Sequence, residues 1–177
     1  VPDGKFTPPL AQLRVGDALW VTNTVFGFLT LDAFADGEDL WLIATGTGLS
    51  AYLSMLRDPT TFTRFKRIVL VHGVRHAFEL AYRDELIALM SQHPGQLTYL
   101  PVTTQEPLTQ HLSPSLSTTD LAPARLTTLL RTGELEQRIG ALLDPSQARV
   151  MLCGNPAMVT EMRALLSERG FAAGRRG

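Results

Sequence analysis

Several features that would mark other classes of protein are scarce or missing in this sequence. The 177 residues include one cysteine, which excludes an intrachain disulfide and favours a reducing compartment. Apolar runs stay well short of the ~20 residues that a membrane-spanning helix needs, and no secretory pattern opens the chain. The formal net charge of −1 gives no reason to expect nucleic acid or an anionic membrane as a partner. We therefore expect a cytoplasmic protein that works as a monomer.

Motifs of other enzyme classes are also missing. No Gly-x-Ser-x-Gly elbow is present, so an α/β-hydrolase would lack its nucleophile. No glycine loop ends in Gly-Lys-Ser/Thr, which argues against an ATPase. His72 and His76 lie four residues apart but have no third ligand close in sequence, so we expect no metal site.

The most informative segment that is present joins an apolar run to a glycine turn. Residues 40–45 are mostly apolar and are followed by Gly46-x-Gly48-x-x-Ala51 and then by apolar residues at helical spacing. A strand that enters a helix through such a turn directs backbone N–H groups at one place, where phosphate binds. Gly46 would permit the tight turn, Gly48 would let a pyrophosphate approach, and Ala51 would allow close packing.

The next apolar run predicts which nucleotide binds. Residues 68–72 are β-branched and continuous, as in a buried parallel strand. An acidic residue after this strand would hold the ribose 2′-hydroxyl of NAD, but Arg75 stands there and the first acid is Glu79. An arginine suits a 2′-phosphate, so this segment favours NADP.

Strands and helices alternate from residue 39 onward, which predicts an α/β fold. We expect a Rossmann-like parallel sheet with helices on both faces. The expected strands are 40–45, 68–72, 97–102 and 149–153. The expected helices are 49–57, 77–92, 125–131, 134–143 and 156–169. Residues 39–177 would form this NADP-binding domain, while 1–38, with strand candidates 18–22 and 27–31, would be a remnant of an antiparallel barrel.

Three motifs together resemble the nucleotide-binding half of bacterial ferredoxin–NADP reductases, also called flavodoxin–NADP reductases. They are Ala44-Thr45-Gly46-Thr47-Gly48-Leu49, Val71-His72-Gly73-Val74-Arg75 and Cys153-Gly154-Asn155-Pro156, in the family's order and spacing. The resemblance covers nearly the whole chain. It implies an enzyme that passes a hydride between NADPH and FAD, and single electrons between FAD and ferredoxin or flavodoxin.

The same resemblance implies that the chain is incomplete. Family members carry FAD on an N-terminal barrel with an Arg-x-Tyr-Ser/Thr motif, which this sequence lacks, and they end in an aromatic tail that would begin beyond Gly177. Thr7 matches a hydroxyl of the family's FAD-pyrophosphate turn, but Pro8 replaces a second hydroxyl and removes an N–H group. We therefore expect these 177 residues to be incompetent for flavin-mediated electron transfer.

By resemblance, the nucleotide site has three parts. Thr45, Gly46, Thr47 and Gly48 would bind the nucleotide through the glycine turn. Arg75 and Arg125 would hold the 2′-phosphate, while Gln105 replaces a third arginine, and an insertion rich in Ser, Thr and Pro separates positions 103 and 123. Cys153, Gly154, Asn155 and Pro156 would lie beside the nicotinamide, where the Cys153 thiol orients the ring and is not a nucleophile.

Two other functions stay open. The first is a related NAD(P)H-dependent flavin oxidoreductase with another electron acceptor, without a plant-type iron–sulfur appendage, since that would need several cysteines. The second is a non-catalytic nucleotide-binding fragment. Bound flavin distinguishes these alternatives, because a bare nucleotide domain does not absorb in the blue.

Overall fold

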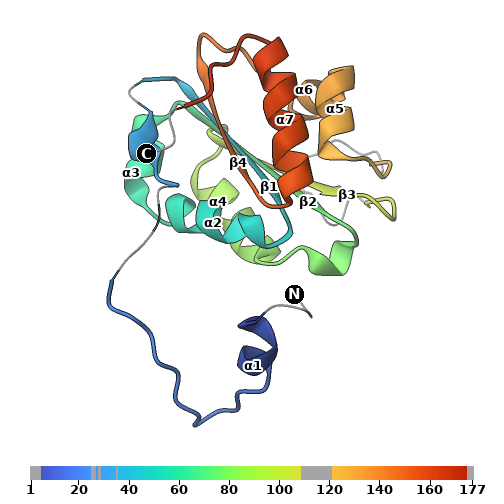
Figure 1. Cartoon of the computed structure of the whole chain (residues 1–177). Coiled ribbons are helices and arrows are strands. Elements are labelled where there is room, and N and C mark those ends of the chain that lie inside the picture. Colours follow the sequence, from blue (N-terminus) through green and yellow to red (C-terminus); the bar gives the residue numbers. More distant parts are fainter. Residues whose placement is uncertain (1–4, 25–26, 28, 35, 109–120, 175–177) are drawn as a thin grey trace.

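The computed structural model describes residues 5–24, 27, 29–34, 36–108 and 121–174. In these residues four strands form one parallel sheet in the order β3-β2-β1-β4 (Figure 1). The strands are β1 (Asp39–Thr45), β2 (Arg67–Val74), β3 (Leu97–Thr103) and β4 (Ala148–Cys153). Each overlaps a predicted strand and differs from it by only one or two residues at an end.

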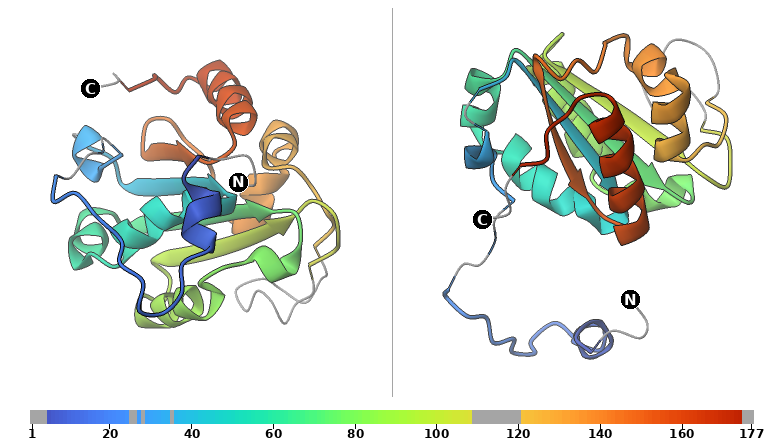
Figure 2. Two further views of the ribbon diagram at one scale, coloured as in Figure 1. Left: turned by 60° about the horizontal axis from the view of Figure 1, so that its bottom comes forward. Right: turned by 45° about the horizontal axis from the view of Figure 1, so that its top comes forward.

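Helices cover both faces of this sheet (Figures 1 and 2). On one face lie α2 (Leu49–Leu56), α3 (Pro59–Arg64) and α4 (Arg83–Gln92), and on the other α5 (Leu126–Thr132), α6 (Glu134–Ile139) and α7 (Pro156–Glu168). The alternation along β1 sends Leu40 and Leu42 into the first layer's core, and Trp41 and Ile43 into the second. Burial on both faces explains the continuous apolar run, and the predicted α/β class is confirmed.

The predicted helix 77–92 is wrong as a single element. A short 3₁₀ turn, η3 (Ala77–Glu79), precedes α4, and Tyr82 between them adopts a left-handed φ of 58°. Leu80 is buried in a small cluster with Val74 and Leu108, so the chain must bend toward the end of β2 before α4 begins. The spacing of apolar residues along 77–92 could not predict this contact, because it involves residues distant in sequence.

Two further helices differ from the expectation. The helix predicted over 134–143 ends at Ile139, because Gly140 takes a left-handed φ of 72°. The helix α3 was missed, although its signals are in the sequence. The Asp58 side chain accepts a hydrogen bond from the Thr60 N–H (2.9 Å), and Pro59 stands at the first helical position.

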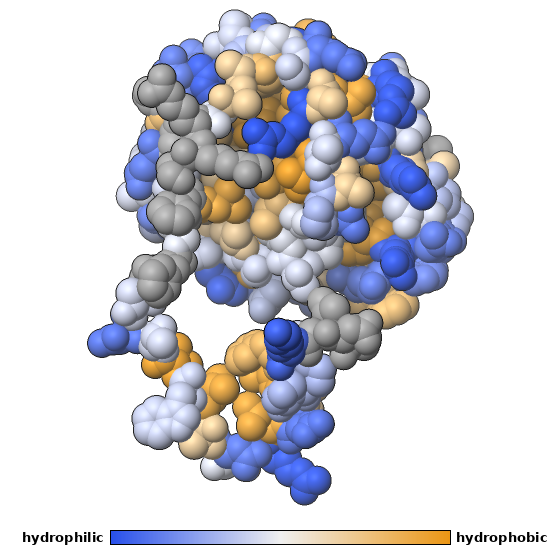
Figure 3. Space-filling view, viewed as in Figure 1, coloured by the Kyte–Doolittle hydropathy of each residue, from blue (hydrophilic) through white to orange (hydrophobic). Residues whose placement is uncertain are grey.

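The described residues among the first 38 carry a helix and a 3₁₀ turn but not the expected strands. They hold α1 (Thr7–Ala11) and η1 (Leu31–Ala33), and none of their described residues lies in a strand. The strand candidates 18–22 and 27–31 are therefore wrong for the described residues, which do not include residue 28. Val15, Trp20 and Val21 are exposed. Figure 3 shows that apolar residues lie at the surface of this N-terminal segment. No described strand pairs with this segment, and an unpaired strand has no hydrogen-bonded neighbour to stabilise it.

The end of this segment packs on the sheet domain. Leu31 and Phe34 contact the core, and the Arg64 guanidinium donates to both of their carbonyl oxygens, 2.8 Å to that of Leu31. Packing with the α/β domain thus begins before residue 39. The barrel remnant and the domain boundary themselves stay predictions.

No described helix is long and apolar enough to cross a membrane. No group of three His, Cys, Asp or Glu side chains among the described residues is arranged to hold a metal ion. The two histidines that lie four apart have separate surroundings, since His72 contacts Gly46 and His76 lies near Glu106.

Candidate functional site

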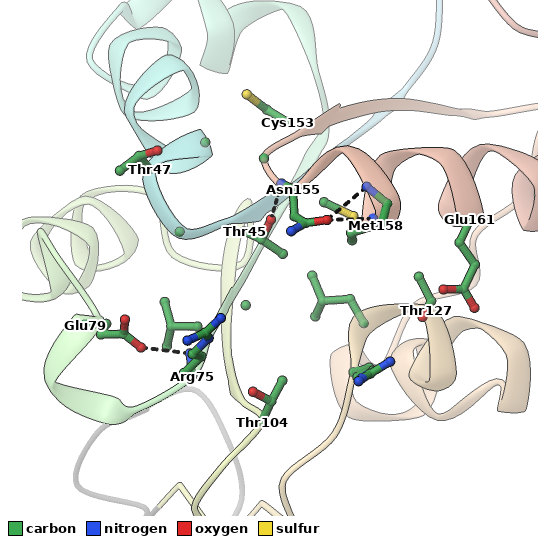
Figure 4. Close-up of a pocket in the computed structure, with 18 residues that line it drawn as sticks. Thr45, Thr47, Arg75, Glu79, Thr104, Thr127, Cys153, Asn155, Met158 and Glu161 are labelled. Atoms are coloured by element: carbon green, nitrogen blue, oxygen red, sulfur yellow. Dashed lines mark hydrogen bonds between the residues drawn. The ribbon is translucent and has the colours of Figure 1, made fainter. Parts of the chain in front are cut away.

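A cavity of about 860 Å³ opens at the carboxyl ends of β1, β2 and β4 (Figure 4). Ligands of open α/β sheets bind at such an edge. Nine predicted site residues line it: Thr45, Gly46, Thr47, Gly48, Arg75, Arg125, Cys153, Gly154 and Asn155. Pro156 follows directly as the first residue of α7 but is not in the lining. The structure therefore assembles the three sequence motifs in one place.

Thr7 is not part of this assembly. It is exposed at the start of α1, and none of the described residues 5–24 lines the cavity. In Figure 1, α1 lies apart from the sheet and its helices. The proposed contact of Thr7 with FAD stays a prediction.

The glycine turn forms the 3₁₀ turn η2 (Gly46–Gly48), which leads directly into α2. Gly46 has a left-handed φ of 53°, so the expected demand for glycine at a tight turn is met. Beneath the turn lies His72, which is 1% exposed and has its Nε2 3.0 Å from the Gly46 carbonyl oxygen. Since a carbonyl only accepts, Nε2 carries the hydrogen. Burial lowers the pKa of His72, which keeps the ring neutral.

Gly48 is required for packing, which the sequence did not predict. Its φ of −58° is ordinary helical backbone, so conformation does not require glycine. A Cβ at this position would collide with the Cys153 carbonyl oxygen and lie 2.9 Å from the Gly154 nitrogen. Glycine at this position therefore clears space for the turn between β4 and α7, and the expected approach of a pyrophosphate to Gly48 stays a prediction.

The turn between β4 and α7 is fastened to the end of β1. The Asn155 N–H donates to Thr45 Oγ1 at 2.8 Å. Gly154 has φ 135°, and a Cβ there would collide with the same hydroxyl and lie 2.7 Å from the Thr45 carbonyl oxygen. The Asn155 side chain caps α7 by accepting from the Ala157 and Met158 N–H groups at 2.9 and 3.3 Å. Asn155 thus orders the amino end of α7 at the cavity.

The end of β2 brings a basic and an acidic group together. Arg75 is exposed and lines the cavity. Glu79 folds back so that its Oε2 accepts from the N–H groups of Arg75 (2.9 Å) and His76 (2.8 Å). These two bonds, the one from His76 foremost, hold the pKa of Glu79 below its ordinary value. The acid therefore lines the same cavity, which its distance in sequence from the strand did not predict.

Arg125 also lines the cavity, at the residue before α5. Within the described parts of the chain, neither Arg125 nor Arg75 has a carboxylate within 4 Å of its guanidinium. The Gln105 N–H donates to the Arg75 carbonyl oxygen at 3.1 Å, so position 105 does lie beside Arg75. Residues 109–120 of the predicted insertion fall outside the described residues. Its two described ends meet through Leu108 and Leu121, which exchange backbone hydrogen bonds of 3.0 Å.

Cys153 is half-buried at the end of β4 and lines the cavity. Its side chain packs against the core beneath α2, and its carbonyl lies against Gly48. Sequence reasoning missed several lining residues, among them Thr104, Thr127, Met158 and Glu161. Met158 and Glu161 lie three residues apart on α7, and this helical spacing from Asn155 was an available signal. Arg131 donates to Glu161 at 2.5 Å, and this bond lowers the pKa of that carboxyl.

The fold and the cavity at the carboxyl edge of the sheet define the class of dinucleotide-binding α/β domains. A family model described as the oxidoreductase NAD-binding domain matches residues 42–164. The chain belongs to this family.

The individual proteins that the chain is similar to have more specific names than the family model. The chain is 36% identical over 179 residues to a ferredoxin–NADP reductase of Pseudomonas aeruginosa, covering 97% of this chain and 65% of that protein. It is 38% identical over 161 residues to a flavodoxin/ferredoxin–NADP reductase of Escherichia coli, covering 91% and 61%. A solved ferredoxin NADP+ reductase from Neisseria gonorrhoeae, with bound FAD and NADP, superposes with a TM-score of 0.85 at 32% identity, covering 99% and 67%.

These relatives confirm the resemblance that the three motifs predicted. The chain spans 61 to 65% of the length of the two curated relatives. The activity, cofactors and partners of the whole protein are therefore taken up as a proposal.

Proposed function

We propose that this chain binds NADPH for a flavin-dependent oxidoreductase that transfers electrons between NADPH and ferredoxin or flavodoxin through FAD. The observation that carries the proposal is the cavity at the carboxyl edge of the sheet, where the glycine turn, Arg75, Arg125 and Cys153 converge. The relatives named ferredoxin–NADP reductase support the same reading.

The described residues fit a nicotinamide dinucleotide. Backbone N–H groups of η2 and of the first turn of α2 would bind the pyrophosphate, aided by the positive end of the helix. Arg75 and Arg125 would bind the 2′-phosphate, because both line the cavity and neither guanidinium is neutralised by a described carboxylate at contact distance. Cys153, at the end of β4, would contact the nicotinamide and fix its orientation.

The described residues do not by themselves form an FAD site. Thr7 is exposed on α1, outside the described cavities, and the neighbouring Pro8 has no N–H group to donate. We therefore derive no step through the flavin. In the proposed reaction this chain binds and orients the nucleotide, while a bound flavin supplies the redox chemistry.

Several further points are part of the proposal. Residues 1–38 would belong to the flavin domain and 39–177 to the NADP domain, and the protein would work as a cytoplasmic monomer, without nucleic acid or membrane. The single cysteine supports a reducing compartment. The alternatives are a flavin oxidoreductase with another acceptor and a non-catalytic nucleotide-binding fragment.

The absorbance spectrum of the purified chain distinguishes a nucleotide-binding fragment from the two kinds of flavin oxidoreductase. We expect no retained FAD.

Glu79 favours a second candidate ligand, NAD. An acid near the end of the second strand is the usual partner of a ribose 2′-hydroxyl, and Glu79 lines the cavity. Its Oε2 already accepts from two N–H groups, so we place the arginines first.

The test compares adenosine 2′,5′-bisphosphate with AMP by titration calorimetry. A charge-assisted hydrogen bond is worth ~1.5–3 kcal/mol, less at exposed side chains, so the bisphosphate is expected to bind about tenfold tighter. Arg75→Gln should remove much of this preference. Arg163→Gln is the matched control, because it removes an exposed arginine that lines a different cavity. Equal affinities, or a preference for AMP, would instead assign the site to NAD.

A further inference from the structure

His72 lies within the buried apolar run of β2 and is only 1% exposed. The strand pairs with β1 on one side and β3 on the other, so the ring is anchored in the interior of the sheet. Its Nε2 donates to the Gly46 carbonyl oxygen at 3.0 Å, while Nδ1 is buried without a hydrogen-bond partner among the described residues. A buried unpaired nitrogen is costly, and an apolar side chain would avoid that cost. Packing alone therefore does not account for a histidine at this position.

The peptide bond between Gly46 and Thr47 does account for it. The Gly46 carbonyl oxygen accepts from His72 and also from the Leu49 N–H at the start of α2. In a trans peptide the carbonyl and the following N–H point in opposite directions. The carbonyl is turned toward His72, which lines none of the described cavities, whereas Thr47 lines the cavity at the carboxyl edge of the sheet (Figure 4). The Thr47 N–H is therefore turned toward that cavity.

We propose that His72 is a positioning residue for the dinucleotide, which fixes the Gly46–Thr47 peptide so that the Thr47 N–H donates to the pyrophosphate. The inference rests on the proposed function, because it presupposes that the glycine turn binds this group. The first N–H groups of a helix have no partner within it, so that of Thr47 is available to a ligand. Gly46, with φ 53°, has no side chain that restricts its backbone, and the hydrogen bond from β2 supplies the missing constraint.

The size of the effect follows from what remains when the His72 hydrogen bond is lost. The Gly46 carbonyl oxygen keeps its bond from the Leu49 N–H, so the turn persists while its peptide is held less firmly. The contact between the Thr47 N–H and a charged phosphate oxygen then weakens. We expect ligands with a pyrophosphate to bind about tenfold less tightly, and ligands without one to bind as before.

The experiment uses two probes that share the 2′-phosphate and differ in the pyrophosphate. They are 2′-phospho-ADP-ribose, which has the pyrophosphate, and adenosine 2′-monophosphate, which does not. Titration calorimetry measures both on His72→Leu, which removes the donor, and on His72→Gln, whose amide can still donate to Gly46. Thr61→Val is the matched control, because the buried Thr61 hydroxyl also donates to a backbone carbonyl, that of Met55 at 2.7 Å, but does not line the cavity.

The ratio of the two affinities should fall about tenfold in His72→Leu and stay close to that of the unmodified protein in His72→Gln and Thr61→Val. An unchanged ratio in His72→Leu, or an equal fall in His72→Gln or Thr61→Val, overturns the inference while the NADP assignment stands. If neither probe binds the unmodified protein, the proposed function fails as well.

A second measurement does not depend on the folding of any variant. In the ¹H–¹⁵N spectrum of the unmodified protein, the Thr47 amide signal should shift when 2′-phospho-ADP-ribose binds and shift much less with adenosine 2′-monophosphate. A Thr47 signal that responds equally to both probes, or to neither, shows that this N–H does not donate to the pyrophosphate and overturns the inference.

Discussion

Gly48→Ala tests whether this glycine serves the fold or the ligand. The backbone at Gly48 is ordinary helical, with φ −58° and ψ −21°, so alanine can adopt it without strain. In an open helix the change would stabilise the protein by up to ~1 kcal/mol. Here the added Cβ would lie 2.6 Å from the Cys153 carbonyl carbon and 2.9 Å from the Gly154 nitrogen. Both atoms belong to backbone and cannot rotate away.

The magnitude follows from what has to move. Relieving the collision requires the turn between β4 and α7 to shift away from η2, against the hydrogen bond from Asn155 to Thr45. Overpacking of this kind costs ~1–3 kcal/mol, and a rigid backbone neighbour places Gly48→Ala at the upper end. A loss of ~3 kcal/mol lowers the Tm of a domain of this size by about 6–12 °C. Nucleotide affinity should fall as well, since both turns line the cavity.

Urea unfolding measures the cost directly, as a lower midpoint at unchanged slope. Gly95→Ala is the matched control, because Gly95 has φ 75° with nothing within 4 Å of a Cβ, so only its ~1–2 kcal/mol conformational cost is paid. We expect Gly48→Ala to lose more stability than Gly95→Ala. If Gly48→Ala is as stable as the unmodified protein and loses only nucleotide binding, Gly48 serves the pyrophosphate and the packing argument is refuted.

Two further predictions concern the same edge of the sheet. Burial lowers the pKa of folded His72. Below about pH 6.5 the unfolded chain therefore binds a proton that the folded chain does not. The free energy of unfolding should decrease as the pH is lowered, by up to ~1.4 kcal/mol per pH unit. In His72→Gln, whose amide can still donate to Gly46, the midpoint of urea unfolding should lose this part of its pH dependence; an unaltered profile would contradict the assignment. Asn155→Ala should cost ~1 kcal/mol by removing the cap of α7, whereas Asn155→Asp should retain most of the stability; equal losses in both variants would show that the cap is not the cause.

The sheet could be predicted because its signals are local. Each strand is a short apolar run bounded by turn residues, and β1 is continuous because residues from both helical layers pack on it. The glycine turn and the capped start of α7 could likewise be predicted, because their signals lie in residues that are neighbours in sequence. The cavity then followed from topology, since the carboxyl ends of β1, β2 and β4 meet at one edge.

The parts that escaped prediction depend on contacts between distant residues. The requirement for glycine at position 48 comes from Cys153 and Gly154, more than a hundred residues further along the chain. Glu79 reaches the cavity because Leu80 is drawn into a cluster with Leu108, which breaks the expected long helix. The hydrogen bond between His72 and the Gly46 carbonyl oxygen joins residues 26 positions apart, so it could not be predicted from neighbouring residues.

These distant contacts join the two halves of the site into one unit before any ligand binds. Gly48 admits the carbonyl of Cys153, Gly154 admits the hydroxyl of Thr45, and the Asn155 N–H then bonds to that hydroxyl. The turn that would bind the pyrophosphate and the turn that would contact the nicotinamide therefore cannot move independently. Such preorganisation lowers the ordering cost of binding. It also implies that a substitution in one turn changes the geometry of the other, so effects on phosphate and nicotinamide contacts should be coupled.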